Sequence, residues 1–182
     1  YKAEKSKPSK IAIWQQQLTE KALRLTGFEP NTAAEALIPK GMSRFYLDEA
    51  ESLQACIPGA GGVFTARSLA KIYAALANHG EIDGVRLLSE KTVGELVKVH
   101  NRNRGDVVPM AMHWRLGYHR VFTTWPKTPY AFGHFGYGGS GAWADPSRHL
   151  AVGFIVNTGS GSPFADLRIW KINTAIIEAV GG

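Results

Sequence analysis

Hydrophobic residues recur along this chain with two different periods, and the change falls near residue 113. Before that point apolar positions recur every three or four residues, which is typical of amphipathic helices. This spacing predicts helices over residues 11–25, 32–37, 65–79 and 89–100. After it apolar and polar residues alternate, which predicts strands over residues 114–122, 130–134, 140–144 and 150–157. A last helix is predicted over residues 162–179.

Small polar residues mark the ends of these elements. Thr65, Ser89 and Ser162 each precede a predicted helix, where a hydroxyl can accept a hydrogen bond from a backbone N–H. Asp83-Gly84 and residues 145–148 predict hairpin turns. Helices come first and antiparallel strands follow, with a final helix that can cover the sheet. The predicted fold class is therefore α+β, an antiparallel sheet with flanking helices.

The composition excludes several classes of protein. The 182 residues are 45% hydrophobic, as in ordinary globular domains, and no apolar run is long enough to span a membrane. A single cysteine, Cys56, excludes an internal disulfide. The net charge of +6 arises partly from lysines in residues 1–10, but no aromatic residues alternate with them. We therefore expect a flexible, solvated tail there and no nucleic-acid partner.

The strongest candidate for chemistry is the glycine-rich run over residues 131–146. Within it, Gly133-His134-Phe135-Gly136 places His134 and Gly136 on the same face of a predicted strand. Glycine lets a backbone approach a ligand or another strand closely, and a histidine can donate to a substrate or orient a water. We expect this run to form one wall of an active site on an edge strand. The alternative is a structural histidine with satisfied hydrogen bonds.

Two serines and the remaining histidines offer weaker alternatives. Ser140 lies between strands, whereas the G-x-S-x-G nucleophile needs a strand-to-helix turn, so Ser140 is not expected to be a nucleophile. Ser68 and Lys71 fit S-x-x-K, but an amphipathic helix already explains that segment, and catalysis through this pair is the weaker hypothesis. The other histidines lack zinc-site spacing, so we expect neither a metal nor another cofactor.

Three stretches, in this order, carry a resemblance to a known family. They are residues 57–78, residues 84–89 with the helix that follows, and residues 131–157. Together they resemble the serine β-lactamase and penicillin-binding-protein-like family, in its class C and esterase branch. The resemblance covers residues 57–180 and is poor over 1–56. We therefore expect residues 1–56 to form a tail with a helical and irregular segment, and 57–182 to form the C-terminal part of a β-lactamase-like domain.

The resemblance implies a serine hydrolase that works by acyl transfer. In that family the serine of an S-x-x-K motif attacks a carbonyl, and a lysine and a tyrosine act as its base. His134-Phe135-Gly136 resembles the family's third motif, with Phe135 in place of threonine. The backbone N–H of Tyr137 would then donate to the oxyanion. The resemblance thus implies His134 and Tyr137 as catalytic residues, and Phe135, Gly136 and Gly138 as substrate-binding residues.

The resemblance also implies that the nucleophile lies elsewhere. The family's S-x-x-K motif lies upstream, whereas Ser68 falls in a helix that the family keeps as structure, and Tyr1-Lys2-Ala3 does not match the family's tyrosine motif. We expect an N-terminal segment or second chain to carry the nucleophile, and the sheet of this chain to have an unpaired edge.

The expected substrate is a small-molecule ester or amide. The resemblance favours esterase or lipase-type hydrolysis, because His134 and Phe135 stand where the family's penicillin-binding members have a lysine and a threonine. The alternatives are β-lactamase or D-amino peptidase activity, or a non-catalytic binding or assembly module of the same fold.

Overall fold

The computed structural model describes residues 49–59, 61–108, 110–125, 127–136, 138–157 and 167–181, with scattered helical positions between 14 and 36. Contacts divide the chain into two compact units. One comprises Tyr1–Gly61 and Asn103–Ala111, and the other, here called the sheet unit, comprises Gly62–Arg102 and Met112–Gly182. Much of the predicted helices over 11–25 and 32–37, the tail over 1–10 and the predicted cap Ser162 lie outside the described residues.

The described residues of the first unit include the helical positions between 14 and 36 and a short helix farther along the chain. Helix α3 (Ala50–Gln54) buries none of its side chains. Farther along the chain, an isolated antiparallel bridge joins Arg104 to Ala111. The expected boundary between residues 56 and 57 stays a prediction.

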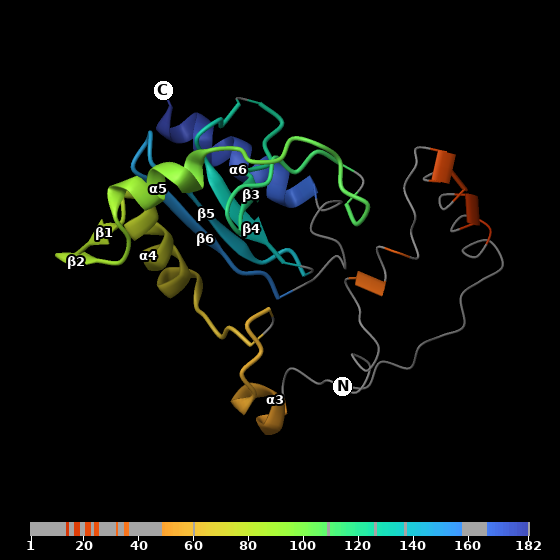
Figure 1. Ribbon diagram of the computed structural model, residues 1–182, viewed down its shortest axis with the longest axis horizontal. Coiled ribbons are helices and arrows are strands. Elements are labelled where there is room, and N and C mark those ends of the chain that lie inside the picture. Colours follow the sequence, from red (N-terminus) through yellow and green to blue (C-terminus); the bar gives the residue numbers. More distant parts are fainter. Residues whose placement is uncertain are drawn as a thin grey trace. The chain divides into compact units, whose positions relative to one another are not determined.

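The sheet unit is built around a four-stranded antiparallel meander (Figure 1). Its strands, in spatial and sequence order, are β3 (His119–Arg120), β4 (Phe132–Phe135), β5 (Gly141–Asp145) and β6 (Leu150–Phe154). Within the described part of the chain, β6 pairs only with β5. With helices flanking this sheet, the predicted α+β class is confirmed.

One predicted strand is much shorter than the alternation implied. Residues 114–122 were expected to form a continuous strand, but only His119 and Arg120 do so. Gly117 has a φ of 77°, and the Arg115 N–H donates to the Tyr118 carbonyl at 2.8 Å, which closes a turn. The chain therefore reverses direction where periodicity alone predicted an extended segment. The other three strands lie within about two or three residues of the ranges predicted from the alternation.

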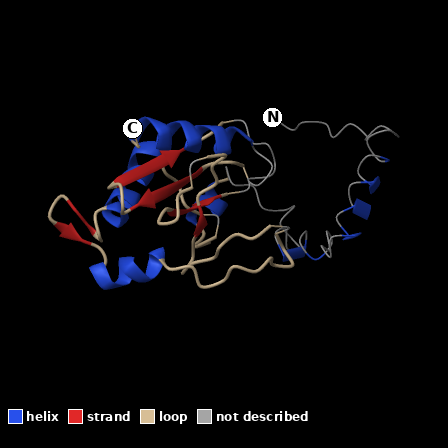
Figure 2. Ribbon diagram, turned by 90° about the horizontal axis from the view of Figure 1, so that it is seen from above, coloured by secondary structure: helices blue, strands red, loops and turns tan. Residues whose placement is uncertain are grey.

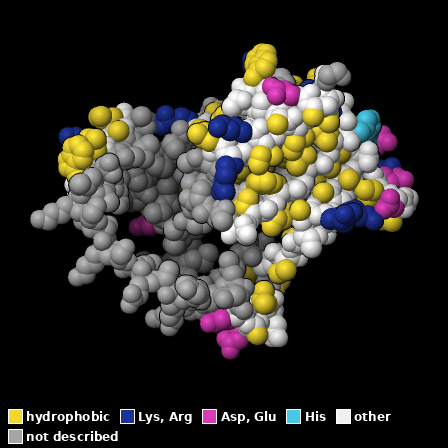
Figure 3. Space-filling model, turned by 180° about the vertical axis from the view of Figure 1, so that it is seen from behind, with side chains coloured by type: hydrophobic (Ala, Val, Ile, Leu, Met, Phe, Trp, Pro, Cys, Tyr) yellow, Lys and Arg dark blue, Asp and Glu magenta, His cyan; other side chains and the backbone are white. Residues whose placement is uncertain are grey.

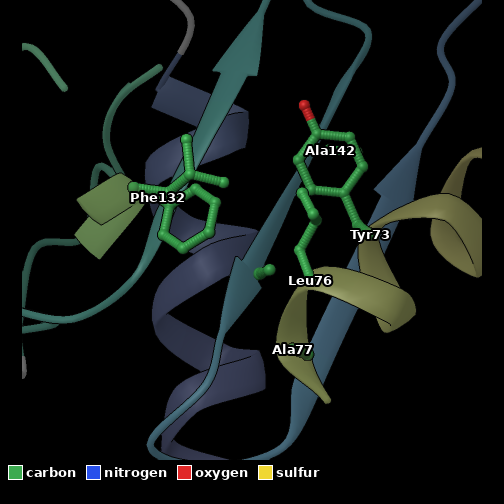
Figure 4. Close-up of a cluster of buried hydrophobic side chains, with 7 residues drawn as sticks. Tyr73, Leu76, Ala77, Phe132 and Ala142 are labelled. Carbon is green, nitrogen blue, oxygen red and sulfur yellow. The ribbon is translucent and has the colours of Figure 1, made fainter. Parts of the chain in front are cut away.

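Helices cover both faces of the sheet, as Figure 2 shows. Helix α4 (Ala66–Ala77) packs on one face, beside α5 (Glu90–Val97), and α6 (Leu167–Val180) packs on the other. The core on the α4 side contains Tyr73, Leu76, Ala77, Leu96, Phe132, Ala142 and Ala144 (Figure 4). The core on the α6 side contains Val121, Ala131, Phe135, Trp143, Ile169 and Ile177.

The predicted helix caps at Thr65 and Ser89 and the predicted turn at Asp83-Gly84 are confirmed, whereas the helix predicted to reach residue 100 ends at Val97. The Thr65 hydroxyl accepts from the Ser68 N–H at 3.1 Å, and the Ser89 hydroxyl accepts from the Thr92 N–H at 3.1 Å. A hairpin joins β1 (Glu81–Ile82) to β2 (Val85–Arg86). Its central residues, Asp83 and Gly84, have φ of 51° and 74°, as a tight primed turn requires.

The β5–β6 turn is organised by a buried carboxylate. Asp145, fully buried, accepts from the Ser147 N–H at 3.0 Å and from the Ser147 hydroxyl at 2.6 Å. Its other oxygen accepts from Arg148 Nη1 at 2.6 Å. The carboxylate is therefore both hydrogen-bonded and paired, which is the condition under which a buried charge is tolerated.

Trp143 connects the sheet to α6. Its ring is fully buried, and its Nε1–H donates to Asn173 Oδ1 at 2.9 Å. Asn173 Nδ2 in turn donates to the Phe122 carbonyl at 3.0 Å. Across β4, Trp143 lies opposite Gly133, where an added Cβ would stand 2.4 Å from the Trp143 Cβ. A side chain at position 133 would therefore clash with Trp143, so glycine is required there.

Several large hydrophobic side chains of the sheet unit remain exposed. Hydrophobic side chains gather on the face seen in Figure 3. The exposed set includes Val63, Ile72, Val85, Leu87, Leu116, Trp125, Tyr130, Ile155 and Leu167. None of the helices in the described ranges combines the length and apolar character that crossing a bilayer requires.

Helix α4 lies directly against β6 at Gly153. A Cβ added there would lie 2.3 Å from the Ala66 carbonyl oxygen and 2.8 Å from the Ala70 nitrogen. Both are backbone atoms of α4, so the clash cannot be relieved by turning a side chain. Glycine at this position allows the helix to rest directly on the strand.

We expect Gly153→Ala to destabilise the protein by about 1–3 kcal/mol, because α4 must move away from the sheet. The control is Gly94→Ala in α5, where an added Cβ meets nothing within 4 Å. That change should stabilise the helix by about 0.5–1 kcal/mol. Thermal unfolding followed by circular dichroism measures both. Equal unfolding midpoints for the two variants would contradict this account of the α4–β6 contact.

Candidate active site

Strand β4 carries the Gly133-His134-Phe135-Gly136 motif and divides its side chains between the two faces of the sheet. His134 lies opposite Ala142, on the α4 side, and is exposed. Phe135 lies opposite Gly141 and is only 2% exposed, in the core on the α6 side. His134 is therefore the motif side chain that solvent reaches, while the Phe135 side chain is enclosed in the core.

The expected edge position of this strand needs a correction. β3 pairs with β4 through Phe132 and Gly133, so the first half of β4 is an interior strand. Beyond Gly133, no further β3 residue continues the ladder. The motif thus begins inside the sheet and reaches its edge at His134, because the turn at Gly117 shortens β3.

The imidazole of His119 occupies the place where the ladder stops. Its Nδ1 lies 2.8 Å from the Arg120 carbonyl oxygen, and its Nε2 lies 3.3 Å from the Phe135 nitrogen. A backbone N–H can only donate, so Nε2 accepts from Phe135 and the ring proton sits on Nδ1. The neutral ring therefore provides, through a side chain, the bond to β4 that a longer β3 would provide through its backbone.

The surroundings of His119 keep it neutral. The residue is 1% exposed, and burial lowers its pKa to about 4, with a further contribution from the charges of neighbouring groups. Aromatic rings surround it, including His134, whose ring centre lies 5.3 Å away. The other ring contacts are with Trp114, Phe122 and Phe135. Although solvent reaches the side chain of His134, partial desolvation also lowers its pKa.

The bond between His119 and the motif strand was not predicted from the sequence, where His119 entered only as a possible zinc ligand. The alternation of the predicted strand was the one indication in the sequence, because it places His119 on the same face as the apolar Val121. Both are buried, at 1% and 4% exposure. A histidine at an inward position needs hydrogen-bond partners, but only the structure shows that one partner is the motif strand.

The loop after the motif is closed by backbone hydrogen bonds. The Gly136 N–H donates to the Ser140 carbonyl at 2.8 Å, and the Gly139 N–H donates to the Gly136 carbonyl at 3.0 Å. The Ser140 hydroxyl accepts from the Val156 N–H at 3.1 Å, which ties the loop to the segment after β6. Tyr137, the expected oxyanion donor, lies outside the described residues.

The glycines of this region fall into two groups. At Gly133 and Gly141, an added Cβ would come within 2.2 Å of a backbone oxygen on the paired strand, so these glycines serve packing. At Gly138 nothing lies within 4 Å, and at Gly136 the nearest atom is 3.6 Å away. Packing among the described residues does not require glycine at 136 or 138, so open space lies beside His134's end of the strand.

The S-x-x-K pair in α4 is engaged in structural contacts. The Ser68 hydroxyl accepts from the Thr65 N–H and donates to the Thr65 carbonyl, both at 3.0 Å, completing a capping box. Lys71 Nζ binds the Asp83 carboxylate at 2.7 Å, with its side chain 64% exposed. A solvated, ion-paired ammonium is a poor general base, so the geometry argues against catalysis through this pair.

Within the described residues, no three His, Cys, Asp or Glu side chains are grouped as a metal ion would require. The features of the motif that bear on chemistry are the imidazole of His134, the backbone around it and the open space at Gly136 and Gly138.

Comparison with known proteins identifies relatives of this chain. The sequence model of the family described as Beta-lactamase matches residues 12–175, a range that starts upstream of the resemblance seen from residue 57. The esterase/beta-lactamase LipL of Mycobacterium tuberculosis is 44% identical over 116 residues, which is 60% of this chain and 25% of LipL. The chain thus spans about a quarter of the length of this curated relative.

Two solved structures are similar to this fold. A penicillin-binding protein homolog from Caulobacter crescentus matches with a TM-score of 0.69 and 31% identity, over 83% of this chain and 41% of that protein. A family VIII carboxylesterase matches with a TM-score of 0.51 and 33% identity, over 57% of this chain and 28% of that protein.

The buried neutral ring of His119 predicts that acid destabilises the protein. Between pH 6.5 and about 4, the unfolded chain binds a proton at this residue and the folded chain does not. The free energy of unfolding should therefore fall by up to about 3 kcal/mol as the pH decreases through this range. His119→Gln, which keeps a donor and an acceptor, should show a smaller decrease.

Urea denaturation at several pH values between 7 and 4 measures this effect. The matched control is the same substitution at the exposed His100. The lowered pKa values of His113 and His134 leave some acid sensitivity in every variant. An unchanged pH dependence in His119→Gln would show that this ring is not a neutral acceptor.

Proposed function

Because this chain belongs to the beta-lactamase family, we propose that it forms the oxyanion side of the acyl-transfer site in a serine hydrolase that cleaves small-molecule carboxylic esters. The observation that carries the proposal is the geometry of β4. The family-like motif loses its pairing with β3 at His134 while it stays paired with β5, and open space follows at Gly136 and Gly138. The names of two relatives, an esterase/beta-lactamase and a carboxylesterase, support the reaction class.

In this proposal the motif contributes one side chain and its backbone. His134 hydrogen-bonds the substrate from the α4 side of the sheet, and Tyr137 donates its backbone N–H to the oxyanion. Gly136 and Gly138 leave room for the acyl group, and Phe135, whose N–H is bound to His119, contributes its backbone carbonyl. A donor aimed at the developing negative charge lowers the barrier by a few kcal/mol, about 2.7–4 in comparable sites.

The nucleophile in this proposal is an S-x-x-K serine outside these residues, on an N-terminal segment or a second chain. The support is that the Ser68 hydroxyl is hydrogen-bonded to Thr65 and that Lys71 is ion-paired with Asp83. The serine oxygen bonds to the ester carbonyl carbon, and the alcohol leaves after taking up a proton. Water then hydrolyses the acyl-enzyme and releases the carboxylic acid, which restores the serine.

β-Lactam hydrolysis is the second candidate. It is favoured by the name of LipL, which includes both activities, and by the similarity to a penicillin-binding protein homolog. Esters are preferred because the motif has His134 where the family's β-lactam-binding members have a cation, and Phe135 points into the core rather than presenting a hydroxyl.

We expect the complete polypeptide that carries this chain to hydrolyse short p-nitrophenyl esters faster than a chromogenic cephalosporin. The reason is that the motif lacks the lysine and threonine that bind a penicillin carboxylate. The measurement is kcat/KM for both substrates, with a chemically inactivated sample as control. Rapid cephalosporin turnover without ester turnover would replace the ester proposal with the second candidate.

Gly138→Ala separates a ligand-binding role from a packing role. An added methyl group meets no described atom within 4 Å, so the unfolding midpoint should stay within a few degrees of the parent. If the acyl group passes this position, kcat/KM for esters should fall by about tenfold, a loss of about 1.4 kcal/mol. Gly94→Ala, which is also open, is the control and should leave kcat/KM unchanged. Unchanged ester turnover in Gly138→Ala would contradict the proposed position of the acyl group.

A further inference from the structure

A concave site lies in the sheet unit, and none of the motif residues lines it. This pocket has a volume of about 470 Å³. Its walls come from the segment around His113, from β3 and the loop that follows it, and from Trp170 of α6. Neither the proposed ester hydrolysis nor any relative's name assigns it a ligand.

The pocket is lined by positive charge. Its described lining includes Arg102, Arg115, Arg120 and Lys127, and no aspartate or glutamate is among those lining residues. Burial, followed by the charges of Arg120, Arg102 and Arg115, lowers the pKa of His113 in the same wall. Cations that share a concave site with low-dielectric walls create a field that attracts anions.

One of these cations is almost fully buried. Arg115 is 6% exposed, and its guanidinium donates to the carbonyl oxygens of Val97, His113 and Pro129 at 3.0, 3.4 and 2.8 Å. These oxygens engage three of its N–H groups, and no aspartate or glutamate among the described residues pairs with its charge. A bound anion nearby would supply the opposite charge that a buried cation requires.

The wall also contains aromatic rings and unpaired donors. Arg120 lies over Phe122, with its guanidinium carbon 5.3 Å from the ring centre, and Phe122 stacks on Trp170 at 5.0 Å. Arg120 Nε and Trp170 Nε1 are buried without a hydrogen-bond partner. Buried N–H groups without an acceptor cost free energy, and both belong to residues that line this pocket.

We propose that this pocket binds a small organic anion, a carboxylate attached to a flat apolar ring. The carboxylate accepts from the arginine cluster, since guanidinium groups match its geometry. The ring packs against the aromatic wall formed by Trp125 and Trp170, both of which line the pocket. The carboxylate of this ligand matches the positive charge of the lining, and its ring matches the aromatic side chains of the lining.

The test is a calorimetric titration of the full polypeptide with 2-naphthoate, and with the neutral 2-naphthamide as a matched ligand. We expect the carboxylate to bind at least about tenfold more tightly than the amide, because one charged hydrogen bond contributes about 1.5–3 kcal/mol. Its affinity should also fall as the NaCl concentration rises. Acetate, which lacks the ring, should bind more weakly than 2-naphthoate.

Variants locate the bound ligand. Arg102 is an exposed residue of the lining, so Arg102→Gln should preserve the fold and weaken 2-naphthoate binding by about fivefold to tenfold. Its matched control is Arg67→Gln on α4, outside the lining, which should not change the affinity. Lys127→Gln provides a second exposed lining variant with the same expected direction.

Three results would overturn the proposal. They are equal affinities for carboxylate and amide, no detectable binding of 2-naphthoate at millimolar concentration, and equal affinities in Arg102→Gln and Arg67→Gln. Tight binding of acetate alone would show that the site takes a simple anion and that the aromatic wall contributes nothing. Because the readout is binding, the result does not depend on whether the protein hydrolyses esters.

Discussion

The packing of Trp143 against Gly133 supports much of the sheet unit. The fully buried indole lies over a strand position without a side chain, and its N–H donates to Asn173 of α6. Asn173 then holds the Phe122 carbonyl, in the segment that follows β3. Three separate stretches of chain are thereby fixed to one ring. This contact therefore supports β4, α6 and the wall that Phe122 contributes to the arginine-lined pocket.

The motif strand is in turn positioned by two different devices on its two sides. On one side, β5 pairs with all four residues of β4. On the other, β3 supplies two pairs, and the His119 imidazole then takes the place of the third by accepting from Phe135. A neutral side chain thus completes the sheet next to the exposed His134. The end of the ladder leaves the last part of the motif free of strand pairing on that side.

Local signals in the sequence predicted the elements whose ends depend on one or two residues. The caps at Thr65 and Ser89 and the turn at Asp83-Gly84 follow from side-chain chemistry and backbone preference, and they lie where expected. The strand over 114–122 failed because Gly117 adopts a positive φ in a turn that alternation does not reveal. The position of His119 and the arginine-lined pocket depend on contacts between segments that are distant in the sequence, and periodicity does not predict such contacts. That His134 and Phe135 face opposite sides of the sheet follows from their adjacent positions in a strand.

The capping box at the start of α4 has a consequence for motif searches. A serine at the third position of a helix is favoured because it returns a hydrogen bond to the cap, and Ser68 does so through Thr65. A lysine one turn later suits the exposed face and finds Asp83. Ordinary helix-start chemistry therefore reproduces the spacing of a catalytic signature. Replacing Ser68 would remove the returning hydrogen bonds of this cap and loosen the start of the helix that lies on β6, so a change of activity in such a variant needs a stability measurement beside it.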